Sequence, residues 1–457
     1  MYKFSRYKEQ YKSNLLLALP VVLTQLGQIF TQFTDNIMVG RYGGDDPVPL
    51  AAVSFGGAVF FILFIASVGI ALGMTPLVGE LYAQGKHKKS AVLLQNGIIF
   101  YTLLGIGMTI VQFSIIPLMY HLGQPAEVVE MAIPYYRMLA YSMPFIMLFF
   151  AFKQFLEGVG NTKVEMTVAI ISNIANFGLN WMFIYGNMGF PEMGAEGAGL
   201  GTLLARIIAS ILMIAYFLRK AKYRVYLNGF SFLNYSWKTI RQLLRMGIPI
   251  SSQMFMEASA FIGTSIMMGW LGTVTMSASH ITMTLGNCVF MIVMSIGAAT
   301  TIRVSHCYGA RNISDISLAA KASYHLVLAW NFIAAIIIIS LRHYIPLLFT
   351  TNAEVAALAS NLLIFIALFQ LSDGIQNISV GILRGIQDVK IIAPIAFISY
   401  WLLNLPIGYL FGFTLGMGAE GLILGFTFGL SAAAVLLIIR IRRSLRRLYS
   451  NSELKLS

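Results

Sequence analysis

Three acidic residues lie inside long apolar stretches of the 457-residue chain: Asp35, Glu257 and Asp373. A charged side chain at the centre of a membrane-spanning helix costs about 2.5–3.5 kcal/mol on insertion scales, so residues of this kind are usually functional. Carboxylate oxygens can bind Na⁺, a proton or an organic cation. The alternative is that each acid pairs with a buried base for packing, and Arg206 is the base that could pair with Asp35.

Neutral polar residues accompany Asp35 in the same half of the chain. Asn176 and Asn180 are four positions apart and so share one helix face. Asp35 and Asn180 lie at a similar depth, about 7 Å from the same side of the membrane at 1.5 Å per residue. Thr202 lies in its own span, in the part nearer to that side. Oxygen ligands of this kind suit Na⁺ or a carboxyl-bound proton. Interhelical hydrogen bonding is the alternative explanation for the two asparagines.

The composition requires lipid around most of this chain. It is 58% hydrophobic and only 11% charged, with a mean hydropathy of +0.76. Soluble domains have about 25% charged residues. We therefore predict an all-α, polytopic membrane protein, in which Glu257 and Asp373 lie near mid-membrane, about 16–18 Å from the nearer span end. Twelve apolar stretches are long enough to cross a bilayer: 15–39, 51–75, 92–118, 131–156, 164–187, 195–218, 242–270, 276–300, 318–341, 355–383, 389–415 and 418–440.

Positive charges predict the orientation of these spans, since cytoplasmic loops of membrane proteins are rich in Lys and Arg. With the N-terminus in the cytoplasm, 27 of the 31 Lys and Arg fall in cytoplasmic segments, and four fall elsewhere. The exceptions are Arg41, Arg137, Arg206 and Arg342. The net charge of +13 therefore reflects membrane topology rather than nucleic-acid binding. Cys288 and Cys307 do not indicate a disulfide framework.

An internal repeat organises the whole chain. The pentapeptide MGAEG occurs at 193–197 and 417–421, before spans 6 and 12. EGVGNTK at 157–163 corresponds to RGIQDVK at 384–390, an offset of 227. These collinear pairs predict two homologous six-helix halves of the same orientation, as in secondary transporters. We predict an N-lobe over 1–218, a basic cytoplasmic linker over 219–241, and a C-lobe over 242–457 with a basic tail. MGAEG itself is best explained as a tight turn whose glycines adopt positive φ.

These features resemble the multidrug and toxic compound extrusion (MATE) family, in particular its NorM-like branch. The motifs that carry the resemblance extend over essentially the whole chain: TDNIMVG at 34–40, MTPLVGELYAQG at 74–85, EGVGNTK, NFGLNWMFIYG at 176–186, SSQMFMEASAFIG at 251–263 and LSDGIQNISVGILRG at 371–385. The resemblance implies two six-helix bundles related by a pseudo-two-fold axis along the membrane normal. It also implies antiport of cationic, amphiphilic compounds against Na⁺ or H⁺.

The resemblance also assigns the sites. It implies a cation site in the N-lobe formed by Asp35, Asn176, Asn180 and Thr202, and a second in the C-lobe formed by Glu257 and Asp373, with Phe290 able to contribute an aromatic face. Either site is a candidate for Na⁺. Such relatives commonly carry a tyrosine one turn before the second aspartate, where this chain has Phe369. Substrate contacts are implied at Asp35, Glu257, Asp373 and Phe369.

Our functional prediction is multidrug efflux by alternating access, with no cofactor other than the coupling ion. The alternative within the same superfamily is a lipid-linked precursor flippase or a metabolite exporter. No HExxH, GxSxG or Walker motif occurs, so we expect no enzyme activity. We expect a monomer in the inner membrane with both termini in the cytoplasm, whose partners are the bilayer and small cationic drugs or toxins, and no nucleic acid.

Overall fold

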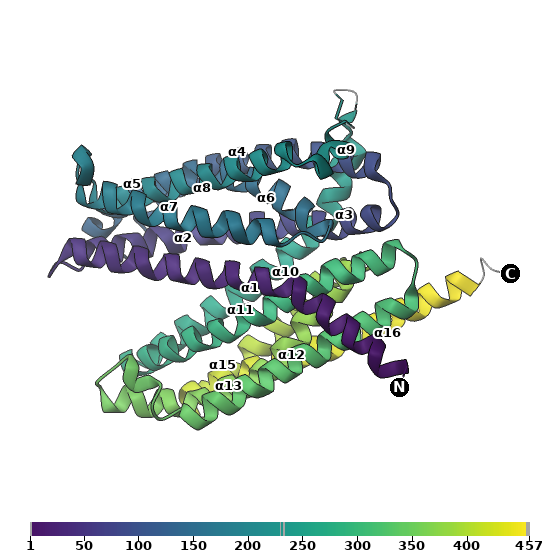
Figure 1. Cartoon of the computed structure of the whole chain (residues 1–457). Helices are drawn as coiled ribbons and strands as arrows, with labels where there is room; N and C mark the ends of the chain where they lie inside the picture. The colour runs from purple at the N-terminus through teal and green to yellow at the C-terminus, as the bar shows by residue number, and fades with distance from the viewer. Residues whose placement is uncertain (1, 229, 232–233, 454–457) are drawn as a thin grey trace. The chain divides into compact units, whose positions relative to one another are not determined.

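The computed structural model describes residues 2–228, 230–231 and 234–453, in which the regular secondary structure is helical throughout (Figure 1). The helices of the first half and the linker are α1 (Tyr2–Gly43), α2 (Val48–Leu72), α3 (Met74–Ala83), α4 (His87–Met119), α5 (Ala126–Tyr141), α6 (Met143–Gly158), α7 (Lys163–Tyr185), η1 (Asn187–Gly189), α8 (Gly194–Arg219), η2 (Ala221–Tyr223) and α9 (Arg224–Leu227). Those of the second half are α10 (Trp237–Trp270), α11 (Thr273–Gly309), α12 (Ile313–Leu341), η4 (Pro346–Leu348), α13 (Ala353–Gly385), α14 (Ile392–Ala396), η5 (Phe397–Asn404), α15 (Leu405–Tyr409), η6 (Leu410–Thr414) and α16 (Gly418–Glu453).

Each of the twelve predicted spans coincides with one of these helices or with a consecutive group of them. Among the described residues, eleven helical stretches are long and apolar enough to cross a membrane. The remaining predicted span, 242–270, lies on α10, whose apolar sequence is interrupted by polar residues such as Gln253 and Glu257. Its 34 residues still extend about 51 Å at 1.5 Å per residue, which is longer than a bilayer core. The prediction of an all-α polytopic membrane protein is confirmed.

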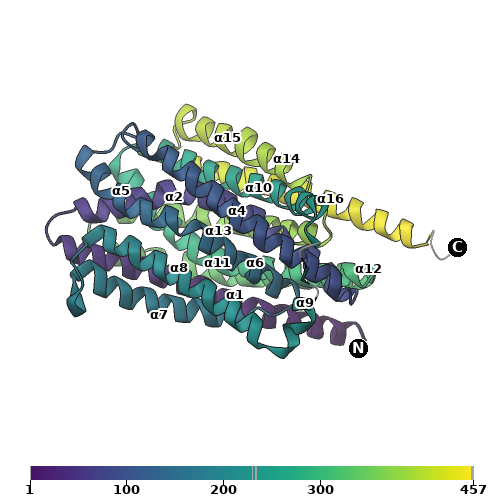
Figure 2. The ribbon, with the colours of Figure 1, turned by 90° about the horizontal axis from the view of Figure 1, so that it is seen from above.

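Two spans are less regular than the sequence suggests. The span predicted at 131–156 consists of α5 and α6, which meet at Ser142, because Pro144 has no N–H to donate to the preceding turn. The span predicted at 389–415 contains two π-helical segments, η5 and η6, and packs along α16 (Figure 2). Irregular backbone at membrane depth is tolerated where it is buried in protein, and π-helical segments often mark functional sites.

The chain forms two compact units, and the divisions between them fall within α1 and α10. Unit 2 contains residues 20–251, and unit 1 contains residues 1–19 together with 252–457. The start of α1 is held in unit 1 by Asn14 Nδ2, which donates to Ser323 Oγ at 2.9 Å. The start of α10 is held in unit 2 by Ser251 Oγ, which donates to the Ala66 carbonyl at 2.7 Å. The lobe boundaries predicted from the sequence, near 218 and 242, are the two ends of the linker. The compact units divide at other positions, after residue 19 and after residue 251.

The backbone conformation of the turns repeats with the sequence. Gly160 and Gln387, which are 227 residues apart, both have positive φ, at 81° and 63°. The MGAEG glycines Gly194 and Gly418 are also left-handed, at 54° and 61°, and each begins a helix. A β-carbon makes this conformation unfavourable, so Gln387 keeps a strained turn where its counterpart is glycine. The positive φ predicted for the pentapeptide is therefore found at its first glycine, but the residues from that glycine onward belong to the start of a helix rather than to a separate turn.

Substituting the two MGAEG glycines separates backbone strain from steric clash. A β-carbon at Gly194 would lie 2.6 Å from Cε1 of Tyr42, whereas at Gly418 it would meet no atom within 4 Å. We expect Gly418→Ala to cost about 1–2 kcal/mol, from the left-handed φ alone. Gly194→Ala should cost more than this, because the added β-carbon must also displace the Tyr42 ring. Thermal unfolding of the two purified variants measures the difference, and equal losses would contradict this explanation.

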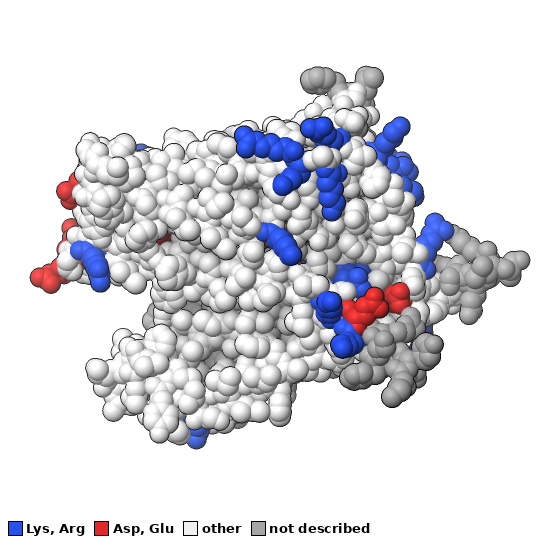
Figure 3. All heavy atoms as spheres, viewed as in Figure 1, with Lys and Arg blue, Asp and Glu red and all other residues white. Residues whose placement is uncertain are grey.

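Charged side chains gather at the helix ends. On unit 2, many Lys and Arg side chains lie over the end that carries α9, and mostly uncharged atoms cover the helices between the ends (Figure 3). Such an uncharged band is the surface that a helical protein presents to the hydrocarbon core.

In unit 1, the loop after α13 is tied to α16 through Asp388. Arg440 donates to both Asp388 oxygens, from Nε at 2.7 Å and from Nη2 at 2.9 Å, and Ser444 Oγ donates to Oδ2 at 2.5 Å. Burial acts to raise the pKa of Asp388, but the hydrogen bonds from Arg440 and Ser444 outweigh it and lower the pKa below its usual value. The attachment of this loop to α16 therefore depends on the ionised form of the Asp388 carboxylate.

The Asp388→Asn variant should be less stable than the wild type by about 1–3 kcal/mol at pH 7. Because the folded-state pKa is depressed, the contribution is present above the ordinary Asp value of about 3.9 and is lost as pH falls through the folded-state value. Thermal unfolding at pH 7 and near pH 3 should show a gap between variant and wild type that shrinks on acidification. A gap that stays constant with pH would show that Asp388 acts by packing alone.

Candidate functional site

The residues predicted for the N-lobe site come together in unit 2. Asp35 Oδ1 on α1 accepts a hydrogen bond from Asn180 Nδ2 on α7 at 2.6 Å. The same amide lies 3.4 Å from Asn176 Oδ1, and Asn176 Nδ2 lies 3.5 Å from Thr202 Oγ1 on α8. Thr202 Oγ1 donates to the Ala198 carbonyl at 3.0 Å. Three helices thus place one carboxylate, two amides and one hydroxyl in a continuous polar chain.

One buried oxygen among these polar side chains has no hydrogen-bond donor in the described structure. Asn180 is 0% exposed, and among the described residues nothing donates to its Oδ1. Leaving a buried acceptor unsatisfied costs about 1–3 kcal/mol, so such a group in a native protein needs an explanation. A cation held between Asp35 and the Asn180 carbonyl oxygen would satisfy it.

Gly201 on α8 shapes this site, although no sequence pattern singles it out. A β-carbon at Gly201 would overlap Asn180 Oδ1, so the asparagine occupies space that only glycine leaves open. We expect Gly201→Ala to displace the Asn180 amide and to weaken ion binding at least about tenfold, because ligand sites tolerate shifts of only about 0.5 Å. Isothermal titration of purified protein with Na⁺ or protons measures this. Ala at Gly178, where a β-carbon has no neighbour within 4 Å, is the matched control and should bind like the wild type.

Arg206 does not form the ion pair with Asp35 that the packing alternative requires. In the described part of the chain, no Lys or Arg nitrogen lies within 4.0 Å of an Asp35 oxygen. Arg206 Nη1 instead donates to Ser142 Oγ at 2.5 Å, and its guanidinium lies 4.9 Å from the Phe60 ring centroid. It interacts with Asp35 over a longer distance, through its charge. The charge of Arg206 therefore acts on Asp35 from a distance, but no direct ion pair with Arg206 neutralises the Asp35 carboxylate.

Polar residues on α10 and α13 connect to Glu257 in unit 1. Glu257 Oε2 accepts from Gln253 Nε2 at 2.6 Å, one turn earlier on α10. Gln253 Oε1 in turn accepts from Arg384 Nη2 at 2.8 Å. Arg384 is part of α13 and acts electrostatically on Glu257, whereas the sequence predicts a cytoplasmic location for it. Arg384 is therefore a second base, besides Arg206, that acts on one of the predicted acids.

Asp373 faces the same acid from α13. It is buried and interacts through its charge with Glu257, and no basic nitrogen of the described residues lies within 4.0 Å of its oxygens. Tyr400, on the π-helical segment η5, is fully buried and interacts with both acids. Its hydroxyl makes no hydrogen bond of regular geometry among the described residues. Two acids and a phenol thus lie in one neighbourhood, in which Asp373 and Tyr400 are buried and Glu257 is partly buried.

Tyr400 supplies a phenol oxygen near the two acids, and no sequence pattern predicts it. The position one turn before Asp373 is Phe369, which is 4% exposed and lies in the hydrophobic core, with its ring centroid 5.8 Å from that of Phe426. In this structure Phe369 is therefore a core residue, and its contact with substrate remains a prediction. Phe290 is partly exposed on α11.

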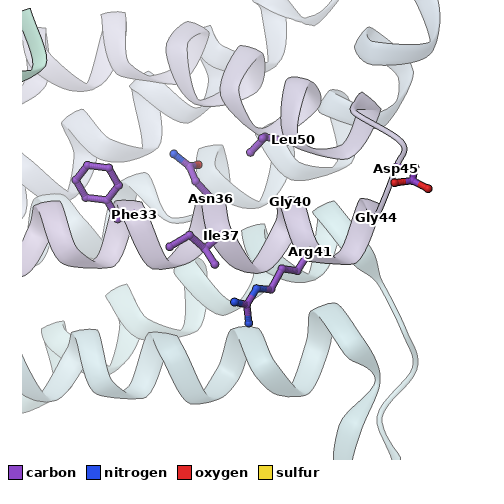
Figure 4. Close-up of a pocket in the computed structure, with 8 residues that line it drawn as sticks. All are labelled: Phe33, Asn36, Ile37, Gly40, Arg41, Gly44, Asp45 and Leu50. Atoms are coloured by element: carbon purple, nitrogen blue, oxygen red, sulfur yellow. The ribbon is translucent and has the colours of Figure 1, made fainter. Parts of the chain in front are cut away.

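A separate hollow of about 730 Å³ lies at the end of α1 (Figure 4). It is wide open, and its lining is Phe33, Asn36, Ile37, Gly40, Arg41, Gly44, Asp45 and Leu50. Figure 4 shows most of these residues along α1, with Asp45 in the following loop. Asp35 does not line this hollow but is hydrogen-bonded to Asn180 on α7. The hollow is therefore separate from the predicted cation site.

Comparison with known proteins independently supports the division of the sequence into two homologous halves. The MatE family model matches the chain twice, over residues 20–182 and 249–410. The chain belongs to the MatE family. The two matched segments of this MatE protein begin 229 residues apart, which agrees with the offsets of 224–227 between the repeated motifs. The resemblance stated from the sequence is confirmed.

Named relatives cover almost the whole MatE chain. Multidrug resistance protein NorM of Photobacterium profundum is 32% identical over 442 residues, which is 95% of this chain and 96% of that protein. NorM of Vibrio vulnificus (strain YJ016) is 31% identical over 440 residues, 95% and 96% of the two chains. A solved structure of a MATE protein in a bent conformation has a TM-score of 0.88 at 21% identity and covers 98% of each chain. The MATE transporter fold is thus shown.

Proposed function

We propose that this MatE protein exports cationic, amphiphilic compounds in exchange for Na⁺ or H⁺. One observation carries the proposal: Asp35 in unit 2 and Glu257 in unit 1 are partly buried and accept hydrogen bonds from neutral side-chain amides, and neither acid has a Lys or Arg nitrogen within 4.0 Å among the described residues. Uncompensated carboxylates are costly in a membrane and are retained for ion or substrate binding. The relatives named multidrug resistance protein NorM support the choice of substrate class.

Exchange follows from competition for the same negative charge. When the site is open to the outside, Asp35 takes up Na⁺ or H⁺ and loses its attraction for a bound cationic drug, which leaves. When the site is open to the cytoplasm, the ion departs and the carboxylate attracts the next drug. Glu257 and Asp373 act in the same way in unit 1. Aromatic and methionine side chains accommodate varied apolar groups and hold organic cations through cation–π contacts.

The membrane potential has no net effect on a one-for-one exchange. A monovalent cation that enters gains about 2.3 kcal/mol per 100 mV. Exporting a drug of charge +1 costs the same electrical energy, so the two contributions cancel. The ion concentration gradient alone then drives efflux, whereas two ions per drug would make efflux sensitive to voltage.

Orientation and access belong to the same proposal. The Lys and Arg distribution supports a cytoplasmic location for both termini, and the bacterial relatives support a location in the inner membrane. The tandem repeat suits alternating access, in which two halves rock around central sites. We propose that a single chain carries out the whole cycle as a monomer.

A lipid-linked precursor flippase is the competing function within the superfamily. It would need an interior rich in Lys and Arg to hold pyrophosphate. The interior arginines described above, Arg206 and Arg384, each interact with a nearby acid. Neither is part of a basic cluster of the kind that a pyrophosphate group requires, so we favour the efflux function.

Reconstitution into vesicles tests the proposal. Vesicles loaded with a fluorescent organic cation are placed in a Na⁺ gradient at constant pH, or in a pH gradient without Na⁺. We expect one of these gradients, directed opposite to the movement of the dye, to accelerate its release at least tenfold over protein-free vesicles. Release that is independent of both gradients would overturn ion-coupled efflux.

A further inference from the structure

Three ionisable side chains form a second buried cluster in unit 2, apart from Asp35. Lys153 Nζ on α6 lies 2.6 Å from Glu165 Oε1 on α7 and 4.0 Å from Glu157 Oε1 on α6. Glu165 is 1% exposed and Glu157 is 4% exposed. The sequence predicts a cytoplasmic location for Lys153 and does not place either glutamate among the interior acids, so this cluster is a finding of the structure.

The charges of the cluster do not balance. Two carboxylates and one ammonium leave a net charge of −1 in a site that is nearly closed to water. A buried carboxylate without compensation costs several kcal/mol and is instead neutralised by a proton or a cation. Lys153 is committed to Glu165 at the shorter distance, so Glu157 is the acid that lacks a counter-charge.

The contacts within the cluster identify the missing group as a proton. Lys153 Nζ lies within 4.0 Å of an oxygen of each carboxyl, so the Glu157 and Glu165 carboxyls are neighbours and act on each other through their charges. Two ionised carboxylates have no hydrogen atom to share, whereas one proton between them provides a hydrogen bond. Glu165 Oε2 has no hydrogen-bond donor within the described part of the chain, and the nearby Gln154 Nε2 is also unpaired. Gln154 is reached through Thr75 on α3, whose hydroxyl lies 2.5 Å from Gln154 Oε1.

We propose that Lys153, Glu157 and Glu165 form a proton-binding site in which the two carboxyls share one proton. The groups that act on Glu157 are Glu165 from α7, Lys153 from its own helix and the neutral Thr75 from α3. The other helices packed on α6, namely α2, α4, α5 and α8, contribute no charged group to Glu157 in the described structure. Glu165 and Asn176 are eleven residues apart on α7, so the two sites are about 16 Å apart along that helix.

The repeat argues against a purely architectural role for the cluster. At the offset of 227, the positions equivalent to Lys153, Glu157 and Glu165 are Val380, Arg384 and Ile392. Unit 1 forms the equivalent turn, with Gln387 in the same left-handed conformation as Gly160, without either acid. The turn therefore does not require the carboxyl pair, and unit 2 has it for a different reason.

Proton linkage of unfolding tests the site, independently of transport. The full-length purified protein and its Glu157→Gln and Glu165→Gln variants are unfolded thermally between pH 5 and pH 9. The unfolded chain releases the shared proton near pH 4.3, whereas the folded chain keeps it, so stability falls as pH rises. We expect the wild-type unfolding constant, relative to either variant, to rise about tenfold per pH unit over this range until the folded pair loses its proton. Profiles that run parallel to those of the variants overturn the proposal.

A control and a second readout keep the test decisive. Glu130→Gln replaces an exposed acid on α5 and should leave the wild-type pH profile unchanged. Infrared spectra at pH 7 should show a protonated-carboxyl stretching band that loses one group in Glu157→Gln. A band of the same intensity in both proteins would overturn the proposal even if the variant unfolds too readily for the pH series.

Discussion

The Asp35→Asn variant is expected to fold normally and to lose ion-driven drug efflux by at least about tenfold. The asparagine carbonyl oxygen can still accept from Asn180 Nδ2, which lies 2.6 Å from Asp35 Oδ1, so the packing of α1 against α7 is preserved. The negative charge that attracts Na⁺, H⁺ or a cationic drug is gone, and the Coulomb energy that binds these charged partners is lost with it. Efflux of a fluorescent cation from reconstituted vesicles, at matched protein content, measures the loss.

The matched control is Asp45→Asn, an exposed acid in the loop after α1. It removes the same charge ten residues away, outside the polar chain of Asn176, Asn180 and Thr202, and should transport like the wild type. If Asp35→Asn retains wild-type efflux, the N-lobe site has no part in coupling. If both variants lose efflux equally, surface charge rather than the site at Asp35 controls transport.

The second large effect is expected from Glu257→Gln in unit 1. Glutamine keeps an oxygen that can accept from Gln253 Nε2, but it leaves Arg384 without the carboxylate that balances its charge. With Glu257, Asp373 and Arg384 ionised, the local charge of the site therefore changes from −1 to zero. We expect binding of organic cations to weaken by at least about tenfold, because a unit charge at close range in a partly buried site is worth several kcal/mol. Binding of a fluorescent cation to the purified variant measures the change.

A double variant makes this prediction more specific. Glu257→Gln combined with Arg384→Gln removes the acid together with the base, and should recover part of the lost affinity if charge is the cause. Glu354→Gln, an exposed acid in the first turn of α13, is the control and should bind like the wild type. Unchanged affinity in Glu257→Gln would remove this acid from the substrate site.

Much of the architecture could be predicted because it depends on local patterns. Apolar stretches of membrane length predicted the helices, and the offset of repeated motifs predicted the two halves. The family resemblance implied that Asp35 and Asn180 share a site, which agrees with their similar predicted depth. The left-handed conformation of Gln387 could be inferred only through its glycine counterpart, since Gln itself does not favour positive φ.

Contacts between distant elements could not be predicted from these patterns. Tyr400 reaches the acids from a π-helical segment, where the 3.6-residue period that assigns helix faces no longer holds. Lys153 and Glu165 lie on different helices, and their sequence positions near span ends suggested solvent rather than a buried pair. Gly201 matters because its missing side chain makes room for Asn180, a role that appears only once α7 and α8 are packed together.

Equilibrium competition tests the central claim most directly. The affinity of purified wild-type protein for a fluorescent organic cation is measured over a range of Na⁺ concentrations at fixed pH, and over a range of pH without Na⁺. If one carboxylate accepts either guest, the apparent Kd of the dye should rise tenfold for each tenfold rise in the coupling ion above its own Kd, and Asp35→Asn should flatten this dependence. A dye affinity that is constant across both series would contradict ion-for-drug exchange at these acids.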